Sequence, residues 1–202
     1  MQKFKGEPGS SEVYEFNQKG KRLIFRPITV DPNSVRVARR TLAESILSSA
    51  SGLDTVANAK IAEVNFRLGI VSEFVEGKGP RLDDLPADQL ANLRGINFLS
   101  GNVDMHPFNL GLSRVGKLKS FDSDRAFWPG LPQKETLLDY GFSVPKLYTR
   151  RFVDFVTDLE PARLSALLNA NCTPEEIAGV QFRRELILRD LKIRGASAIV
   201  RP

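Results

Sequence analysis

The pattern of apolar residues changes once along the 202-residue chain, and this change limits the folds that the chain can adopt. Before the segment Gly77-Lys-Gly-Pro80, short stretches alternate polar and apolar residues, as strands with one buried face do. Beyond that segment, longer stretches repeat apolar residues at helical spacing. We therefore expect an α+β protein in one domain over residues 1–202, with a small β-rich lobe over 1–76 and a helical lobe over 77–202.

The β-rich lobe is expected to begin with a hairpin. Residues 12–16 and 21–26 read as two strands, joined by a turn over 17–20 in which Gly20 can take a positive φ. A helix is then expected from an N-cap at Ser34 to Gly52. Two further strands are expected over residues 55–61 and 66–74, with Gly69 at a turn.

The helical lobe is expected to contain a helix over residues 86–99 and two short strands over 110–112 and 118–121. Helices are then expected at 146–158, 160–170 and 174–195, because proline and acidic residues mark helix starts and Gly195 marks an end. The pair Arg183-Arg184 reads as a solvated helix face.

Composition excludes several kinds of chemistry. With one histidine and one cysteine, the chain can form neither an internal disulfide nor a zinc site built from several such residues. The net charge of +5 comes from dispersed basic residues, so we expect no nucleic-acid partner. No apolar stretch predicts a membrane span or a Sec-type signal peptide. Carboxylate and amide oxygens remain, and these suit Mg²⁺.

Such oxygens gather in the segment over residues 101–127. Asp104 and Asn109 lie five residues apart on an expected loop, and Asp122 follows Asn109 by thirteen residues. A tight hairpin would fold Asp122 back beside that loop, where an amide and a carboxylate could hold Mg²⁺ together with phosphate oxygens. Asp104 could orient or deprotonate a hydroxyl. Alternatively, Asp104 and Asn109 are turn-forming residues only.

At Gly101, Asp104, His106 and Asn109, followed by a hairpin and Phe121-Asp122, the sequence resembles the atypical kinase superfamily. That group includes phosphatidylinositol 3/4-kinases, HipA-type toxin kinases and Fam20-type kinases. The resemblance implies a minimal two-lobe protein kinase-like fold that uses ATP and Mg²⁺. It also implies that Asp104 is the catalytic aspartate, that Asn109 and Asp122 hold Mg²⁺, and that His106 braces the catalytic loop.

The resemblance extends into the β-rich lobe. Gly9, Ser10 and Ser11 match the turn that covers the phosphates in this group. Arg26 stands where the group has a strand lysine, and Glu44 stands where the group places the partner of that lysine. The resemblance thus implies that Arg26, positioned by Glu44, contacts the α- and β-phosphates. A surface pair between Glu44 and Arg40 is the alternative.

The segment Ser72–Glu76 matches the hinge between the lobes, so the resemblance implies that the backbone of Glu73, Phe74 and Val75 meets adenine. Three residues depart from the group's pattern. Arg26 replaces a lysine, which is not a conservative change. Met105 stands where the group often has an arginine, and Asp124 stands where a glycine is commoner.

We therefore expect an ATP- and Mg²⁺-dependent phosphotransferase that acts on a hydroxyl, most simply a Ser/Thr of a protein, as in bacterial effector or toxin kinases. Such a protein would work in the cytoplasm or inside a host cell. The alternatives are a pseudokinase or nucleotide-binding module, an adenylylating enzyme, and a lipid kinase on the same fold.

Overall fold

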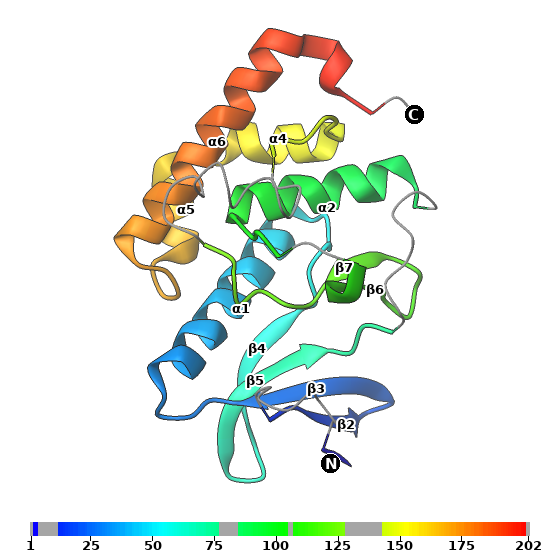
Figure 1. The fold of residues 1–202 in the computed structure, drawn as a ribbon, viewed down its shortest axis with the longest axis vertical. Helices are drawn as coiled ribbons and strands as arrows, with labels where there is room; N and C mark the ends of the chain where they lie inside the picture. Colours follow the sequence, from blue (N-terminus) through cyan, green and yellow to red (C-terminus); the bar gives the residue numbers. More distant parts are fainter. Residues whose placement is uncertain (1, 4–11, 77–84, 105–106, 128–142, 201–202) are drawn as a thin grey trace.

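The computed structural model describes residues 2–3, 12–76, 85–104, 107–127 and 143–200. Its larger sheet is antiparallel and has five strands in the order β1-β2-β3-β5-β4 (Figure 1). The strands are β1 (Gln2–Lys3), β2 (Tyr14–Gln18), β3 (Lys21–Pro27), β4 (Ala59–Val64) and β5 (Arg67–Glu73). The β-rich first part of an α+β fold is thus as the sequence predicted.

The turns of this sheet follow local sequence at one hairpin and tertiary packing at the other. Lys19 and Gly20 have positive φ angles of 51° and 75° and make the predicted β2–β3 turn. The second turn is not at Gly69, as predicted, but at Asn65-Phe66. Gly69 lies inside β5, where a Cβ atom would sit 2.3 Å from the ring of Phe25. The glycine is therefore needed for the close approach of two strands.

Helix α1 (Pro32–Ser51) begins earlier than the sequence suggested. Its N-cap is Asp31, whose carboxylate accepts a hydrogen bond of 3.1 Å from the backbone of Asn33. Ser34 instead accepts a hydrogen bond from the backbone N–H of Thr29, so the predicted cap lies three residues too late. The helix ends at Gly52 in the left-handed region, as glycine allows.

The helical lobe contains α2 (Ala87–Ser100), α4 (Arg150–Asp158), α5 (Pro161–Leu168) and α6 (Pro174–Arg194). The short 3-10 helices are η2 (Pro107–Asn109) and η3 (Gly195–Ala198). A two-stranded sheet, β6 (Leu110–Leu112) and β7 (Leu118–Ser120), matches the predicted pair of short strands. Figure 1 shows this hairpin between the larger sheet and the helices. The predicted α+β class is confirmed.

The segment that precedes β4 connects the two sheets. Residues 55–61 were predicted as a strand, but only 59–61 belong to β4. Val56 forms an isolated parallel bridge with Ser120 of β7. The backbone N–H of Ala57 donates to Ser120 at 2.8 Å, and the N–H of Ser120 donates to Thr55 at 2.9 Å. The β6–β7 hairpin is thereby bound to the chain of the first lobe.

The main hydrophobic core lies among the helices. Each of the five α-helices in the described residues contributes fully buried side chains, for example Leu47, Ile96, Phe152, Leu164 and Val180. Helix α1 also packs against the sheet, because Ala38 and Leu42 contact Ile70 in a second cluster. Helix α1 therefore packs both within the helical core and against the larger sheet. No helix of the described residues has the length and apolar character needed to cross a membrane.

The prediction that Arg183 and Arg184 form a solvated face was wrong, because both side chains are buried. Arg183 donates to the carbonyls of Leu99 and Ser100 at the end of α2, at 3.0 and 3.3 Å. Arg184 donates at 3.0 Å to the carbonyl of Val156 near the end of α4. These carbonyls have no partner within their helices, and cations are favoured at helix C-termini. Burial lowers the pKa of Arg183 to about 10.

Candidate functional site

A cavity of about 350 Å³ lies between the larger sheet and the segment that follows β7. Arg26 and Asp122 supply opposite charges to its wall, which is otherwise mainly apolar. Glu73, Phe74 and Val75 line it as well, so the structure brings these three residues together with Arg26 and Asp122. The remaining lining residues are Val13, Ile24, Ala38, Thr41, Ile70, Ser72 and Phe121.

The segment that leaves β5 uses most of its backbone hydrogen bonds for structure. The N–H of Glu73 donates to Asn58 at 2.9 Å, and the N–H of Phe74 donates to Arg22 at 3.2 Å. Glu76 exchanges two backbone hydrogen bonds with Leu112 of β6, at 2.9 and 2.8 Å. Among the described residues, no backbone hydrogen bond is recorded for the N–H of Val75, which lies between Phe74 and Glu76.

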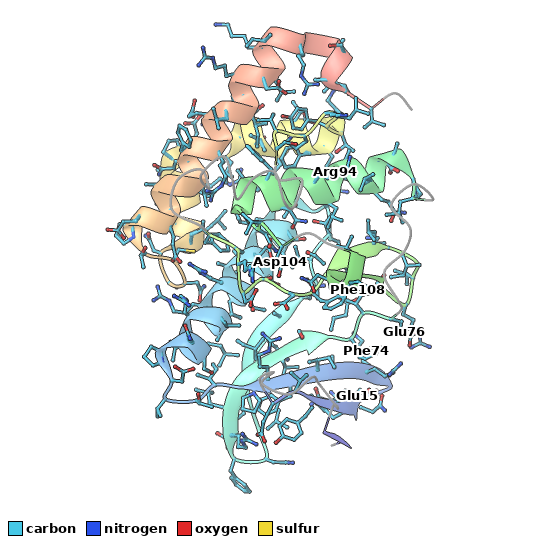
Figure 2. The ribbon with its side chains drawn as sticks, in the orientation of Figure 1. Glu15, Phe74, Glu76, Arg94, Asp104 and Phe108 are labelled. Carbon is cyan, nitrogen blue, oxygen red and sulfur yellow. The ribbon has the colours of Figure 1, made fainter. Side chains whose placement is uncertain are left out.

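The loop after α2 and the strands β6 and β7 bring three of the predicted residues together. The side-chain amide of Asn109 donates to the carbonyl of Asp104 at 3.0 Å. The carbonyl of Asn109 accepts from the N–H of Phe121 at 3.2 Å, which continues the β6–β7 pairing by one step. Asp122 is the next residue. The predicted hairpin geometry thus places Asp104, Asn109 and Asp122 side by side. Figure 2 shows Asp104 and Phe108 on this loop, and Phe74 and Glu76 on the segment that leaves the sheet.

Three carboxylates share this region. Burial raises the pKa of Asp122, and the negative charges of Asp124 and Asp104 raise it further, while the nearby positive charge of Arg26 lowers it. One oxygen of Asp124, Oδ1, is buried without a hydrogen-bond partner among the described residues. The region therefore brings several carboxylates together and has a buried acceptor without a partner among the described residues, which a bound cation would satisfy.

The residues fit Mg²⁺ in particular. No group of three His, Cys, Asp or Glu side chains in the described part of the chain could hold a metal alone. A cation held by Asn109 and Asp122 would therefore take its other ligands from water or from a bound molecule. Mg²⁺ is commonly bound in this way, by one or two carboxylates together with phosphate oxygens.

The structure does not bring Glu44 to Arg26, and this corrects the predicted pairing. Glu44 is fully buried on α1, and its carboxylate accepts hydrogen bonds from Ser100 at 2.7 Å and from Asn102 at 3.3 Å. The structure records no ion pair between Glu44 and Arg26 within its described residues. Burial raises the pKa of Glu44, although hydrogen bonds from Ser123, Ser100 and Asn102 act in the opposite direction.

The alternative pairing of Glu44 with Arg40 is not made either. Arg40 donates to the carboxylate of Glu176 at 3.0 Å and to the backbone carbonyl of Asp124 at 2.9 Å. Arg40 therefore links the segment after Asp122 to helix α6.

Four of the predicted site residues lie outside the described residues. These are Gly9, Ser10, Ser11 and His106, and the departure at Met105 lies there as well.

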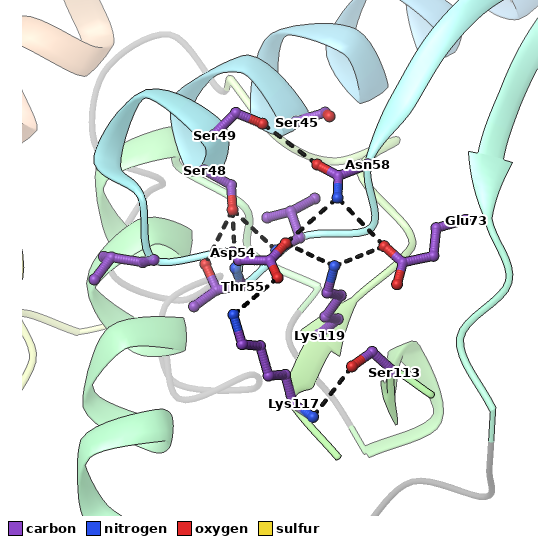
Figure 3. A network of polar contacts seen from close by, with 12 residues as sticks. Ser45, Ser48, Ser49, Asp54, Thr55, Asn58, Glu73, Ser113, Lys117 and Lys119 are labelled. Carbon is purple, nitrogen blue, oxygen red and sulfur yellow. Dashed lines mark hydrogen bonds and ion pairs between the residues drawn. The ribbon is translucent and has the colours of Figure 1, made fainter. Parts of the chain in front are cut away.

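Lys119 belongs to the site region, although the sequence analysis did not identify it. Its side chain is 2% exposed, and its ammonium lies 2.7 Å from Asp54 Oδ1 and 2.6 Å from Glu73 Oε2 (Figure 3). Glu73 lines the cavity, so Lys119 ties β7 to the wall of that cavity. The sequence around Lys119 gave no signal for this role, because its partners lie 65 and 46 residues away.

Arg125 is another residue that sequence reasoning missed. Its guanidinium lies 3.8 Å from the carboxylate of Asp104, on a side chain that is about half exposed. One signal for Arg125 was available in the sequence. Arg125 follows Asp122 by three residues, so its positive charge lies near the same end of the loop. Arg125 places a positive charge beside Asp104 at the open side of the site.

The chain is similar to known proteins in structure but not in sequence. No known family matches the sequence, and no curated protein is similar to it in sequence. A Helicobacter pylori proinflammatory kinase, CtkA, is similar over 89% of this chain and 94% of its own, with 8% identity and a TM-score of 0.49. HipA of Shewanella oneidensis MR-1, solved with HipB and operator DNA, is similar over 94% of this chain and 66% of its own, with 10% identity and a TM-score of 0.41.

Proposed function

We propose that this chain is an ATP- and Mg²⁺-dependent phosphotransferase of the protein kinase-like fold, with a hydroxyl group as its acceptor. One observation carries the proposal. Asp104, Asn109 and Asp122 lie together, and Asp122 borders a cavity that Arg26 and Val75 also line. In this proposal residues 1–76 cover the nucleotide, 72–76 form the hinge, and 77–202 carry the catalytic loop.

The cavity suits the adenine of ATP. A volume of about 350 Å³ lies within the range of small-molecule sites, and an apolar wall with few polar groups is typical of such sites. Ile24 and Ile70 supply apolar contacts for a flat ring. In this proposal the N–H of Val75 would donate to a ring nitrogen, because the N–H groups of Glu73 and Phe74 already donate to Asn58 and Arg22.

The phosphates would lie between Arg26 and the pair formed by Asn109 and Asp122. Mg²⁺, when bound, neutralises phosphate charge and orients the γ-phosphate for transfer. Asn109 and Asp122 would hold that cation. Arg26 is close enough to Asp122 to lower its pKa, and its planar guanidinium can bind phosphate oxygens through two donors. In this proposal Gly9, Ser10 and Ser11 belong to the turn that covers the phosphates.

Asp104 would orient the acceptor. A hydroxyl oxygen attacks the γ-phosphorus, the bond to the β-phosphate bridging oxygen breaks, and ADP leaves with that electron pair. The hydroxyl proton passes to the carboxylate of Asp104. Asn109 holds the backbone of Asp104 at 3.0 Å, and His106 is proposed to brace the same loop.

The acceptor is proposed to be a Ser or Thr of a protein, as for a bacterial effector or toxin kinase acting in the cytoplasm or in a host cell. A second candidate is a nucleotide-binding module without transfer. It is favoured by the replacement of the strand lysine with Arg26 and by the absence of an Arg26–Glu44 pair among the described residues. Adenylylation and lipid phosphorylation on the same fold are further alternatives.

The test uses ATP labelled in the γ- or the α-phosphate, with Mg²⁺ and general protein acceptors. We expect transfer of the γ-label, and loss of that transfer in Asp104→Ala and Asp122→Ala. Asp88→Ala, in the first turn of α2, is the matched control and should retain activity. Transfer of the α-label would indicate adenylylation, and bound ATP without transfer would indicate a binding module. Unchanged γ-transfer in Asp122→Ala would refute the proposed mechanism.

A further inference from the structure

Asn102 occupies the centre of the buried hydrogen bonds beneath the candidate site. It is 2% exposed and lies two residues before Asp104. Its Oδ1 accepts from the backbone N–H of Asp104 at 3.1 Å. Its Nδ2 donates to the backbone carbonyl of Asp122 at 3.1 Å and to both carboxylate oxygens of Glu44 at 3.3 Å. One amide thus contacts three separate segments.

The chemistry of an amide matches this position. A primary amide offers two N–H donors and one carbonyl acceptor. One N–H of Asn102 is shared by the two oxygens of Glu44, and the other reaches the carbonyl of Asp122. An aspartate would lack both donors and would place a second negative charge against Glu44. A serine would be shorter and would offer one donor only.

Glu44 gives this amide a fixed anchor. Its carboxylate is fully buried and also accepts from Ser100 at 2.7 Å. A buried carboxylate is costly unless several donors satisfy it, so Ser100 and Asn102 are held where their donors meet it. Because Glu44 belongs to α1, the helix that packs against both the sheet and the other helices, the anchor is rigid.

We propose that Asn102, anchored by Glu44, is a positioning residue that sets the spacing between Asp104 and Asp122. This inference rests on the proposed function. Asn102 touches neither nucleotide nor acceptor. It holds the backbone of the residue that orients the hydroxyl and the backbone of the residue that holds Mg²⁺. Outer residues that orient metal ligands commonly contribute about 10- to 100-fold to metal affinity or activity.

Asn97 provides a matched control. It is also an asparagine that is 2% exposed, and it lies five residues earlier, in α2. Neither polar atom of its side chain has a hydrogen-bond partner among the described residues. Asn97→Ala and Asn102→Ala therefore remove the same atoms from equally buried places, but only the second removes hydrogen bonds to the site.

The experiment compares Asn102→Ala with Asn97→Ala by two measurements. Mn²⁺ binding in the presence of a non-hydrolysable ATP analogue is followed by electron paramagnetic resonance, and γ-phosphate transfer is followed at saturating ATP. We expect Asn102→Ala to weaken Mn²⁺ binding and to lower kcat, each by about 10- to 100-fold. Binding of the analogue without metal should change by less than about threefold in both variants. Asn97→Ala should retain Mn²⁺ affinity and kcat within about threefold.

Asn102→Ser keeps one donor and is measured in the same way, so that a folding defect of the alanine variant does not decide the outcome. Its Mn²⁺ affinity should fall between those of wild type and a fully disrupted site. Equal Mn²⁺ affinity and kcat in the Asn97 and Asn102 variants would overturn the inference while leaving the proposed function intact. A wild-type protein that neither binds Mn²⁺ with the analogue nor transfers phosphate would refute both.

Discussion

Replacement of Lys119 by methionine tests the network behind the candidate site. The substitution keeps the length of the side chain and removes the ammonium that lies 2.7 Å from Asp54 and 2.6 Å from Glu73. Burial lowers the pKa of Lys119, but hydrogen bonds and charge from Asp54 and Glu73 outweigh this and raise it overall. The favourable interactions of the ammonium with Asp54 and Glu73 thus outweigh the cost of its burial.

The expected loss of unfolding free energy follows from the solvent exposure of Lys119, Asp54 and Glu73. Removal of one partner from a fully buried ion pair costs about 3–5 kcal/mol, because a charge is left without water or partner. Here the side chains of Asp54 and Glu73 are 33% and 29% exposed, so water can partly replace the ammonium. We therefore expect Lys119→Met to lower the free energy of unfolding by about 2 kcal/mol, between the buried and the surface cases.

Lys117→Met is the matched control. Lys117 lies just before β7 on the same hairpin and also pairs with Asp54, at 3.2 Å, but its side chain is 53% exposed. Exposed ion pairs contribute about 0–1 kcal/mol. Urea unfolding followed by circular dichroism gives the free energies. A thermal melt should show a fall in Tm of about 4–8 °C for Lys119→Met, at about 2–4 °C per kcal/mol. Equal stability of the two variants would refute the reasoning.

Three further outcomes are expected. Gly101→Ala should lower the free energy of unfolding well beyond the effect of Gly20→Ala in urea unfolding. Both glycines have positive φ, but a Cβ at Gly101 would lie 2.6 Å from the buried guanidinium of Arg183, whereas the space at Gly20 is open. Cys172 should resist iodoacetamide at pH 8 in the folded protein and react in urea, because burial, together with a nearby negative charge, raises the pKa of its thiol to about 12; rapid labelling of folded protein would contradict this. For Asp54, burial raises the pKa, but its two lysine partners outweigh this and lower it overall. The stability that Asp54 contributes is thus complete above the unfolded pKa of about 4 and is lost as the pH falls through the lower folded pKa. The difference in unfolding free energy between wild type and Asp54→Asn should shrink accordingly in acid, and a difference that grows there would contradict the sign.

Local patterns predicted the elements that depend on neighbours in sequence. The β2–β3 turn needs positive φ at residue 20, and Gly20 signals it directly. The two short strands over 110–112 and 118–121 were predicted as a tight hairpin, and they bring Asp122 back beside Asn109. The clustering of Asp104, Asn109 and Asp122 could therefore be inferred from spacing and one tight turn.

The partners of buried charges could not be predicted in this way. Glu44 was expected to meet Arg26, but the packing of α1 against α2 turns it toward Ser100, 56 residues away. Arg183 was expected to face water, because two adjacent arginines on a helix carry no local sign that carbonyls at the end of α2 await a donor. Gly69 was read as a turn, because its need for glycine arises from Phe25 on another strand. In each case tertiary packing, rather than local propensity, decides the outcome.

The β6–β7 hairpin has a consequence for cooperativity. It is bonded to residues 55–57 through Ser120, to the segment after β5 through Leu112, and to Asp54 and Glu73 through Lys119. These bonds make the hairpin part of the first lobe as much as of the second. Neither lobe can open without breaking them, so the two lobes should unfold as one unit. Amide hydrogens of Ser120 and Ala57 should then exchange with solvent only through that global opening.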